Sequence, residues 1–233
     1  MDDIEAIRGV KEVFVENQYD ALQGTSGSAQ PMMSTSSNMI GSNNAWAAGY
    51  TGAGSRIAII DTGLDEDHPN FAPLSEDKLT AASYDRSDIE ALLTQLNATA
   101  RFNEEATKNH TAMLTADGLY RSSKVVFGFN YADNNLDITH DNDLMGDHGT
   151  HVAGIAAANK VDGSVVQGVA PDAQLYIMKV YGADHGGFAE DILAALEDAL
   201  LLGADVVNMS LGTNAGFTSN ANDFVNAIYD RVT

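Results

Sequence analysis

The order of apolar and polar residues divides much of the chain into short apolar runs and longer helical patterns. Residues 56–60, 175–180 and 204–209 are short, largely apolar runs that end in polar or small residues. Between the last two runs, residues 189–202 repeat apolar side chains at helical spacing. A strand, a crossover helix and another strand predict a parallel sheet with right-handed connections. The pattern therefore predicts an α/β fold.

Three stretches depart from this rhythm. Residues 12–16, within a small N-terminal segment (1–23), alternate apolar and polar positions like a half-buried strand. Residues 24–44 consist mainly of Ser, Gly, Asn, Gln and Met without a period, which is the composition of a linker. Residues 81–121 carry a separate helical pattern and then a polar loop. We interpret them as an insertion that projects from a main domain formed by residues 45–233.

Composition narrows the classes of function. A chain of 233 residues with 44% hydrophobic content suits one packed α/β domain or two small ones. No uninterrupted apolar run reaches the roughly 18 residues that a membrane-spanning helix needs. The absence of cysteine excludes disulfides and thiolate metal sites. A net charge of −21 argues against nucleic acid or an anionic membrane as a partner. It indicates a soluble, self-repelling surface, with ion binding by some carboxylates as the alternative.

Two residues stand where catalytic groups are usually found in α/β proteins. Asp61 follows the apolar run at 56–60, and functional groups collect at the carboxyl ends of parallel strands. A single Asp there could instead cap a helix or form a turn. His148 begins a segment rich in Gly and Ala, residues 148–158, which predicts a helix that can pack deeply. Such a helix would hold the imidazole rigidly, as a general base requires.

Four sequence blocks carry a resemblance to a known family. In order, they are Ile60–Asp65 with His68-Pro69, His148–Gly154, Gly168–Pro171 with Leu175–Val180, and Val206–Gly212. They resemble the Asp block, the His block and two further segments of the subtilisin-like serine proteases (subtilases), over roughly residues 45–220. The long stretch between the Asp and His blocks and the acidic charge are similar to the large cell-envelope subtilases of Gram-positive bacteria. The resemblance implies a parallel sheet with helices on both faces and a secreted or cell-envelope location.

The resemblance also implies roles for individual residues. Asp61 matches the acid that orients the catalytic histidine, and His148 matches the general base, so no cofactor is required for the chemistry. Six residues would form two strands that pair with a polypeptide substrate between them: Ser210, Leu211, Gly212, Asp184, His185 and Gly186. The three strands would then be antiparallel, a form of β-augmentation. His185 stands where the family commonly has a small residue.

The family's nucleophile has no counterpart among these blocks. It stands in Gly-Thr-Ser-Met-Ala-x-Pro, and this motif and the oxyanion-hole asparagine would both lie beyond Thr233. Gly24-Thr25-Ser26 precedes the Asp block and has Gly27 where the motif has Met, so Ser26 is not expected to be the nucleophile. We therefore expect a truncated catalytic domain that is inactive alone and that is self-associated, partly molten or folded only with its C-terminal complement. The alternative is a non-catalytic module that binds peptides or partners.

The N-terminal segment resembles the tail of a subtilase propeptide. Residues 7–16 carry this resemblance, which implies that residues 1–23 are a propeptide remnant and that processing occurs within residues 17–45. The propeptide would be an intramolecular partner that inhibits the catalytic domain until it is cleaved. An unrelated N-terminal hairpin is the alternative.

Metal binding is the least defined expectation. His151 matches a family histidine that is not catalytic, so it should be structural; a metal site of His148, His151 and Asp147 is the alternative, although no fourth ligand is evident. A structural calcium ion is possible, as in many subtilases. Candidate oxygen ligands lie at Asn70, at Asn159–Gln167 including Asp162, and in the acidic stretch Asp133–Asp143, which could also be a solvated loop.

Overall fold

A computed structural model describes residues 18–21, 33–98, 115–141, 143, 145–162 and 166–212. Its centre is a four-stranded sheet in the order β3-β4-β2-β6, in which every neighbouring pair is parallel. The strands are β2 (Arg56–Asp61), β3 (Val125–Asn130), β4 (Gln174–Lys179) and β6 (Val206–Met209). The predicted parallel α/β architecture is confirmed.

Burial explains why these strands are continuously apolar. Every residue of β3 and β4 is buried, because both faces of the sheet are covered and no position of these strands faces water. β2 and β4 pair in register over their whole length, from Arg56 opposite Gln174 to Asp61 opposite Lys179. Asp61 and Lys179 therefore lie side by side at the carboxyl end of the sheet.

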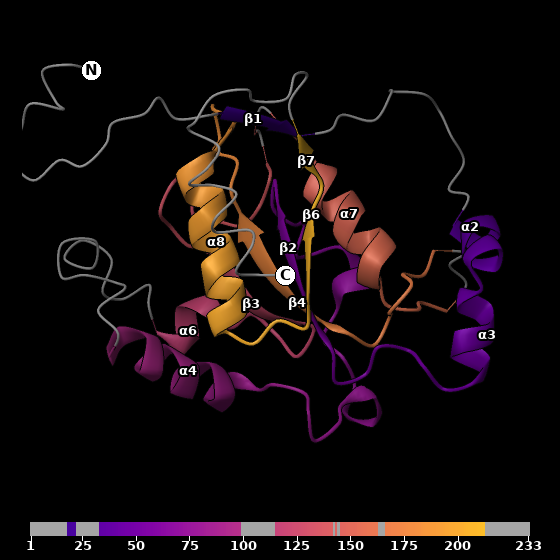
Figure 1. Cartoon of the computed structure of the whole chain (residues 1–233). Helices are drawn as coiled ribbons and strands as arrows, with labels where there is room; N and C mark the ends of the chain where they lie inside the picture. Colours follow the sequence, from indigo (N-terminus) through magenta and orange to yellow (C-terminus); the bar gives the residue numbers. More distant parts are fainter. Residues whose placement is uncertain are drawn as a thin grey trace, which may run out of the picture.

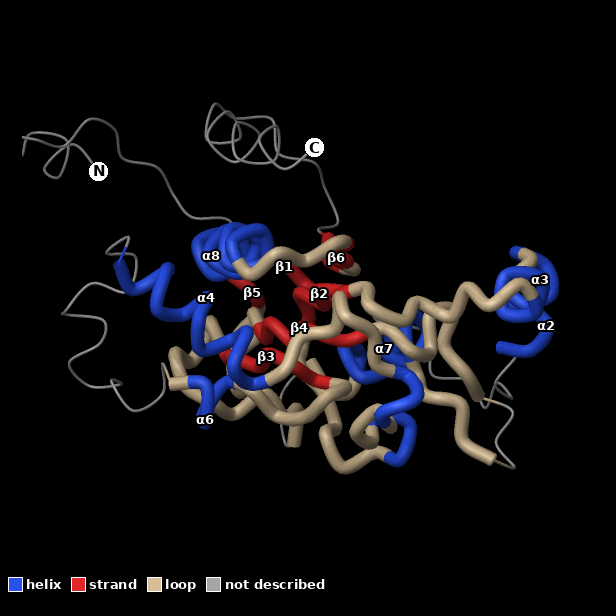
Figure 2. Tube along the Cα trace, turned by 90° about the horizontal axis from the view of Figure 1, so that it is seen from below, coloured by secondary structure: helices blue, strands red, loops and turns tan. Residues whose placement is uncertain are grey.

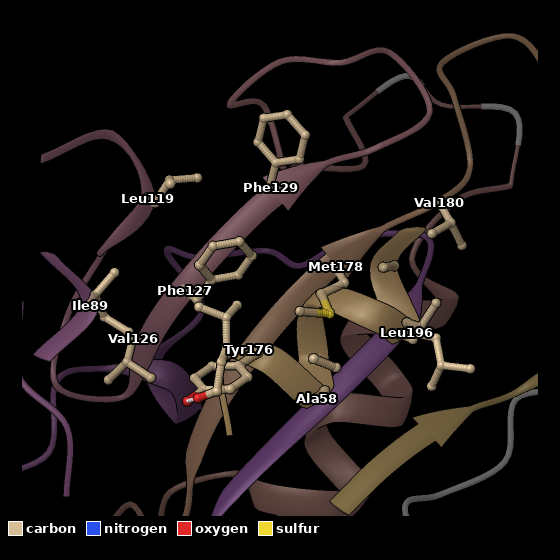
Figure 3. Packing of buried hydrophobic residues seen from close by; sticks show 14 of the residues in the cluster. Ala58, Ile89, Leu119, Val126, Phe127, Phe129, Tyr176, Met178, Val180 and Leu196 are labelled. Carbon is tan, nitrogen blue, oxygen red and sulfur yellow. Dashed lines mark hydrogen bonds between the residues drawn. The ribbon is translucent and has the colours of Figure 1, made fainter. Parts of the chain in front are cut away.

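One face of the sheet is covered by three helices (Figures 1 and 2). They are α4 (Arg86–Ala98), α6 (Ala116–Leu119) and α8 (Ala189–Leu201). The sheet residues that share this core include Ile60, and Figure 3 shows Ala58, Phe127, Tyr176 and Met178 among the others. α8 carries the predicted apolar positions Ile192, Leu196 and Ala199 into this core, which accounts for its helical spacing.

The opposite face is covered by α7 (His148–Ala157). Ala153 and Ala157 pack in a second core with Ile59, Leu175 and Ile177 of the sheet. Small side chains on α7 let the helix approach the strands closely, as its sequence predicts. With α7 on one face and α8 on the other (Figure 2), the predicted arrangement of helices on both faces is confirmed.

The expectation that residues 81–121 project from the domain is wrong for the part that is described. Ile89 and Leu93 of α4 are buried, and so is Leu119 of α6. All three belong to the same core as Phe127 of β3. The amphipathic stripe of α4 packs on the sheet because burying these apolar side chains is favourable. Residues 99–114 lie outside the described part.

The predicted linker also contains regular structure. α2 (Met33–Ile40) and α3 (Ser42–Ala47) lie largely within the serine- and asparagine-rich stretch at 24–44. Trp46 joins this region to the domain, because its indole Nε1 donates a hydrogen bond to the carbonyl oxygen of Val169 at 2.8 Å. The linker interpretation is therefore wrong for residues 33–44. The predicted strand at 12–16 and Ser26 lie outside the described residues.

A small second sheet lies over the carboxyl end of the first (Figure 1). It contains β1 (Gln18–Ala21), β5 (Gly187–Phe188) and β7 (Leu211–Gly212) in the order β5-β1-β7. Both pairings are antiparallel. Two short 3-10 helices, η1 (Pro69–Phe71) and η2 (Glu76–Lys78), complete the described elements. The N-terminal strand β1 thus joins two segments from the distant C-terminal half of the chain.

Candidate active site

Asp61 and His148 meet at the junction of a strand and a helix. Asp61 is the last residue of β2 and is 1% exposed, and His148 is the first residue of α7. The imidazole Nδ1 of His148 lies 2.8 Å from the Oδ1 atom of Asp61. A carboxylate only accepts, so Nδ1 carries the proton and Nε2 keeps its lone pair. A histidine held in this tautomer can accept a proton through Nε2.

The surroundings of Asp61 set its electrostatics. Burial raises the pKa of this carboxyl group, while hydrogen bonds from His148 and from the Thr62 amide act in the opposite direction. The Thr62 amide donates to Oδ1 at 2.7 Å, so one carboxylate oxygen serves both donors. Oδ2 has no hydrogen-bond partner among the residues that are described. A negative charge held in this buried place would stabilise the imidazolium that forms when His148 accepts a proton.

Glycine allows the helix to begin this close to the strand. A Cβ atom at Gly149 would collide with the carbonyl oxygen of Gly63 and would lie 2.9 Å from its nitrogen and 3.1 Å from that of Thr62. Gly63 itself has φ +115°, and a Cβ there would collide with the carbonyl oxygen of Ile138. Gly63 and Gly149 therefore set the close approach that brings His148 to Asp61.

A buried ion pair lies beneath the site. Lys179 is 2% exposed, and its ammonium group pairs with the carboxylate of Asp143. The same Nζ atom donates to the carbonyl oxygen of Thr62 at 2.9 Å. The sequence motifs assign no role to Lys179 or Thr62, and the sequence marks Asp143 only as a candidate calcium ligand. A charged residue inside the apolar run at 175–180 was the available signal, because a buried lysine needs a partner.

The structure places the chain's own residues between the two predicted substrate-binding segments. In β1, Gln18 and Tyr19 pair with Phe188 and Gly187 of β5. The next two residues of β1, at positions 20 and 21, pair with Gly212 and Leu211 of β7. Ser210 precedes β7, and its hydroxyl donates to Oδ1 of Asn208 at 2.9 Å. Residues 18–21 thus occupy the middle position that sequence analysis assigns to a substrate.

The strand opposite β7 differs from the predicted one. The pairing residues are Gly187 and Phe188, directly after the predicted Asp184, His185 and Gly186. His185 instead turns away from the pairing, with Nδ1 2.9 Å from the carbonyl oxygen of Gly186 and Nε2 3.6 Å from Oδ1 of Asp133. Its ring also lies close to that of Phe188, with 5.4 Å between the ring centroids. The strand that pairs with β1 is therefore Gly187–Phe188, and pairing of a substrate with residues 184–186 stays a prediction.

Two of the candidate calcium ligands, Asn70 and Asn159, make hydrogen bonds through their side-chain nitrogens. Asn70 donates through its side chain to the carbonyl oxygen of Asn159 at 2.8 Å, and the Asn159 side chain donates to that of Ala72 at 2.6 Å. Both bonds use the amide nitrogens and tie two loops together, and Oδ1 of Asn159 has no hydrogen-bond partner among the described residues. Within the described ranges, no group of three or more His, Cys, Asp or Glu residues is placed to hold a metal ion. Structural calcium stays a prediction.

His151 does not serve as a packed structural residue. Its side chain is exposed, while that of His148 is 17% exposed. The prediction that His151 mainly stabilises the fold therefore finds no support in burial.

Comparison with known proteins decides the family. Residues 52–232 match the Subtilase family, peptidase S8. The chain belongs to the subtilase family. The PI-type proteinase of Lactococcus lactis subsp. cremoris is 35% identical over 221 residues, which are 91% of this chain and 10% of that protein. The minor extracellular protease Vpr of Bacillus subtilis is 33% identical over 221 residues, 90% of this subtilase chain and 21% of Vpr.

A subtilisin shows a comparable level of sequence identity. Subtilisin of Bacillus sp. strain TA39 is 33% identical over 185 residues, which are 77% of the chain and 32% of that subtilisin. The subtilase chain thus spans less than two thirds of each of these relatives. In the ranges that the structure covers, every helix is too short or too polar to cross a lipid bilayer.

Proposed function

We propose that this chain supplies the acid and the base of a serine endopeptidase. The observation that carries the proposal is the 2.8 Å contact between His148 Nδ1 and Asp61 Oδ1 at the carboxyl end of the sheet. Asp61 would fix the tautomer, and His148 Nε2 would take the proton of a serine supplied from beyond residue 233. The same imidazole would then return the proton to the leaving amine of the cleaved peptide bond. This chemistry needs no cofactor.

The proposed substrate is an extended polypeptide that takes the place of β1. The main chains of β5 and β7 pair with both edges of residues 18–21, which supports a groove that binds any extended segment by backbone hydrogen bonds. Pairing through the backbone carries little sequence information, so side-chain selection would come from the pockets beside the groove. Leu211 and Gly212 of β7 and Gly187 and Phe188 of β5 would contact the bound peptide.

The N-terminal segment is the proposed intramolecular partner. Residues 18–21 fill the middle position of the small sheet, so a substrate cannot pair there until they leave. This placement supports the interpretation of residues 1–23 as a propeptide tail that inhibits the enzyme before processing. A second proposed partner is the C-terminal part of the catalytic domain, which would supply the serine and the oxyanion-hole asparagine.

A non-catalytic peptide-binding module is the second candidate function. Residues 18–21 already pair with β5 and with β7 as an extended segment, which is the observation that favours it. The two candidates differ in one property, the presence of a downstream Gly-Thr-Ser-Met-Ala-x-Pro motif in the parent protein. Only the endopeptidase hypothesis requires this motif.

We propose a secreted or cell-envelope location, which the extracellular relative Vpr supports.

The test uses the parent protein and a fluorophosphonate probe that labels active serine nucleophiles. The parent is expected to hydrolyse a peptide substrate and to be labelled, and His148→Ala should abolish both. His151→Ala is the matched control, because this histidine lies on the same helix but is exposed, and activity should be retained. The 233-residue chain alone should not react. Labelling of Ser26, or full activity of His148→Ala, would contradict the proposal.

A further inference from the structure

We propose that Thr62 is a positioning residue that fixes the start of α7, and with it the His148 imidazole, against the strand that carries Asp61. The proposal rests on the proposed role of His148 as the base. Thr62 follows Asp61 directly and is fully buried, with 0% of its surface exposed. Its side chain lies between the carboxyl end of β2 and the first turn of α7.

Each polar atom of Thr62 is engaged. Its amide donates to Oδ1 of Asp61 at 2.7 Å, and its carbonyl oxygen accepts from Nζ of Lys179 at 2.9 Å. Its hydroxyl accepts from the amide of Gly149 at 2.8 Å and donates to the carbonyl oxygen of Gly146 at 3.0 Å. The main chain of Thr62 is thus held by the acid and by a buried lysine, while its hydroxyl holds the helix.

The two hydroxyl bonds bracket His148. Gly146 lies two residues before the histidine and Gly149 one residue after it, so a single oxygen atom spans the turn that presents the imidazole. The amide of Gly149 is among the first amides of α7, which have no carbonyl partner within the helix. Asp147 stands at the usual capping position, but its side chain makes no capping bond. Thr62 therefore supplies the cap from a different strand.

Only a hydroxyl group satisfies both partners at this place. The oxygen must accept from one backbone group and donate to another, which Ser and Thr can do and Val cannot. Val has nearly the shape of Thr, so Thr62→Val removes the two bonds with little change in packing. Thr62→Ser keeps both bonds. In Thr62→Val, the Gly149 amide and the Gly146 carbonyl would lose their partner, and the first turn of α7 would be free to move away from Asp61.

The first experiment measures amide hydrogen exchange by mass spectrometry on the parent protein. In Thr62→Val, peptides covering the start of α7 are expected to exchange at least about tenfold faster, which corresponds to one lost hydrogen bond of ordinary strength. Peptides from β2 and β4 should keep their rates, which separates a local release of the helix from general destabilisation. Thr62→Ser should match the wild type. The control is Thr94→Val, which removes a hydroxyl bonded to the Glu90 carbonyl in α4.

Unchanged exchange at the start of α7 in Thr62→Val would overturn the proposal. If this variant does not fold, the wild-type parent still decides the matter, because the proposal requires its Gly149 amide to exchange at least about tenfold more slowly than in an unstructured peptide. An unprotected Gly149 amide would overturn the proposal equally.

The second experiment measures peptide hydrolysis by the parent protein. Displacement of a catalytic group by about 1 Å lowers turnover about 100-fold, so Thr62→Val should lower kcat by between about 10-fold and 100-fold with little change in KM. Thr62→Ser should restore kcat. A matching loss in both variants, or a change in KM alone, would overturn the positioning role. If the wild-type parent does not hydrolyse peptides, the proposed function fails, while the exchange experiment still tests Thr62.

Discussion

The two ends of the parallel sheet each bury a lysine, but the two lysines have different partners. At the carboxyl end, Lys179 faces the carboxylate of Asp143 and the carbonyl oxygen of Thr62. At the amino end, the Nζ atom of Lys124 donates to two carbonyl oxygens, at 2.9 Å to Pro171 and at 2.7 Å to Ala173. Burial lowers the pKa of Lys124 to about 7, which the charge of Asp172 opposes only in part.

The difference follows from what each end holds together. The bonds of Lys124 join β3 to the loop before β4, and no proposed catalytic group takes part in them. The bonds of Lys179 join β4 to Thr62 and to the segment that leads into α7, the two elements on either side of the Asp61–His148 contact. We therefore expect changes at the carboxyl end to affect the geometry of the site, and changes at the amino end to affect stability alone.

The largest expected effect separates activity from stability at the carboxyl end. Asp61→Asn should lower kcat of the parent by about 10,000-fold, because an amide does not hold His148 in the required tautomer. Folding raises the pKa of Asp61, so its contribution to stability is present at low pH and is lost as the pH rises through the folded pKa. At neutral pH the variant should thus be at least as stable as the wild type. Peptide hydrolysis and urea unfolding test the two parts, and a strongly destabilised Asp61→Asn would contradict the second.

The next effect concerns the buried ion pair. Asp143→Asn should lower the free energy of unfolding by about 3 to 5 kcal/mol, because it leaves the Lys179 charge buried without its carboxylate partner. The double variant Lys179→Met with Asp143→Leu is the control, since it removes both charges and should cost less. Chemical denaturation of both variants measures the difference. A double variant that is less stable than Asp143→Asn would show that the ion pair itself stabilises this end of the sheet.

At the amino end, stability should rise with pH above neutrality. The pKa of Lys124 falls from 10.5 to about 7 on folding, so between these values the unfolded chain binds more protons and stability rises with pH. One titrating group can change the free energy of unfolding by at most about 1.4 kcal/mol per pH unit. Lys124 should therefore add about 2 kcal/mol of stability between pH 7 and pH 9. Lys124→Met should remove this rise in urea unfolding curves and leave kcat unchanged. The same slope in wild type and variant would show that Lys124 stays charged in the folded protein.

The smallest expected effect is at a surface pair of the amino end. Arg56 donates to the carboxylate of Asp205 through Nε at 3.1 Å, through Nη2 at 3.2 Å and through its backbone amide at 2.8 Å. Asp205→Asn should cost about 0.5 to 1 kcal/mol, because the Asp205 side chain is 45% exposed and water screens the pair. The bond to Arg56 lowers the pKa of Asp205, so the difference should vanish as the pH falls through the folded pKa. A difference that persists in strong acid would contradict the charge interpretation.

The sequence predicts the parts of the fold that one local pattern determines. The strands at 56–61 and 174–179 and the helix at 189–201 follow from apolar runs and helical spacing, and the observed bounds differ by a residue or so. Asp61 and His148 stand in recognisable motifs, and the structure brings them within hydrogen-bond distance. Gly149 also belongs to the His148 motif. The structure shows why glycine stands there, because a Cβ atom at this position would collide with the backbone of Gly63.

The remaining features depend on partners that are distant in the sequence. The helices at 33–40 and 42–47 form in a stretch whose composition resembles a linker. The indole of Trp46 connects this stretch to the domain by a hydrogen bond to the carbonyl oxygen of Val169. The α4 helix has an ordinary amphipathic pattern, and nothing in that pattern says which surface it covers. The role of Thr62 depends on two backbone groups more than 80 residues away, separated by 84 and 87 positions. Sequence periodicity carries no information of that kind.

The placement of β1 has a consequence for the concentration dependence of the proposed inhibition. Under the proposed function, β1 would compete with substrate at an effective concentration that dilution does not change, because β1 and its two partner strands belong to the same chain. Short flexible tethers typically give effective concentrations on the order of millimolar. A free peptide with the sequence of residues 18–21 would lose this advantage and should be a weak inhibitor even if its contacts are identical. Once the segment is cut, its inhibition becomes bimolecular and falls with dilution, so a single cleavage would convert a permanent block into one that a large excess of solvent removes.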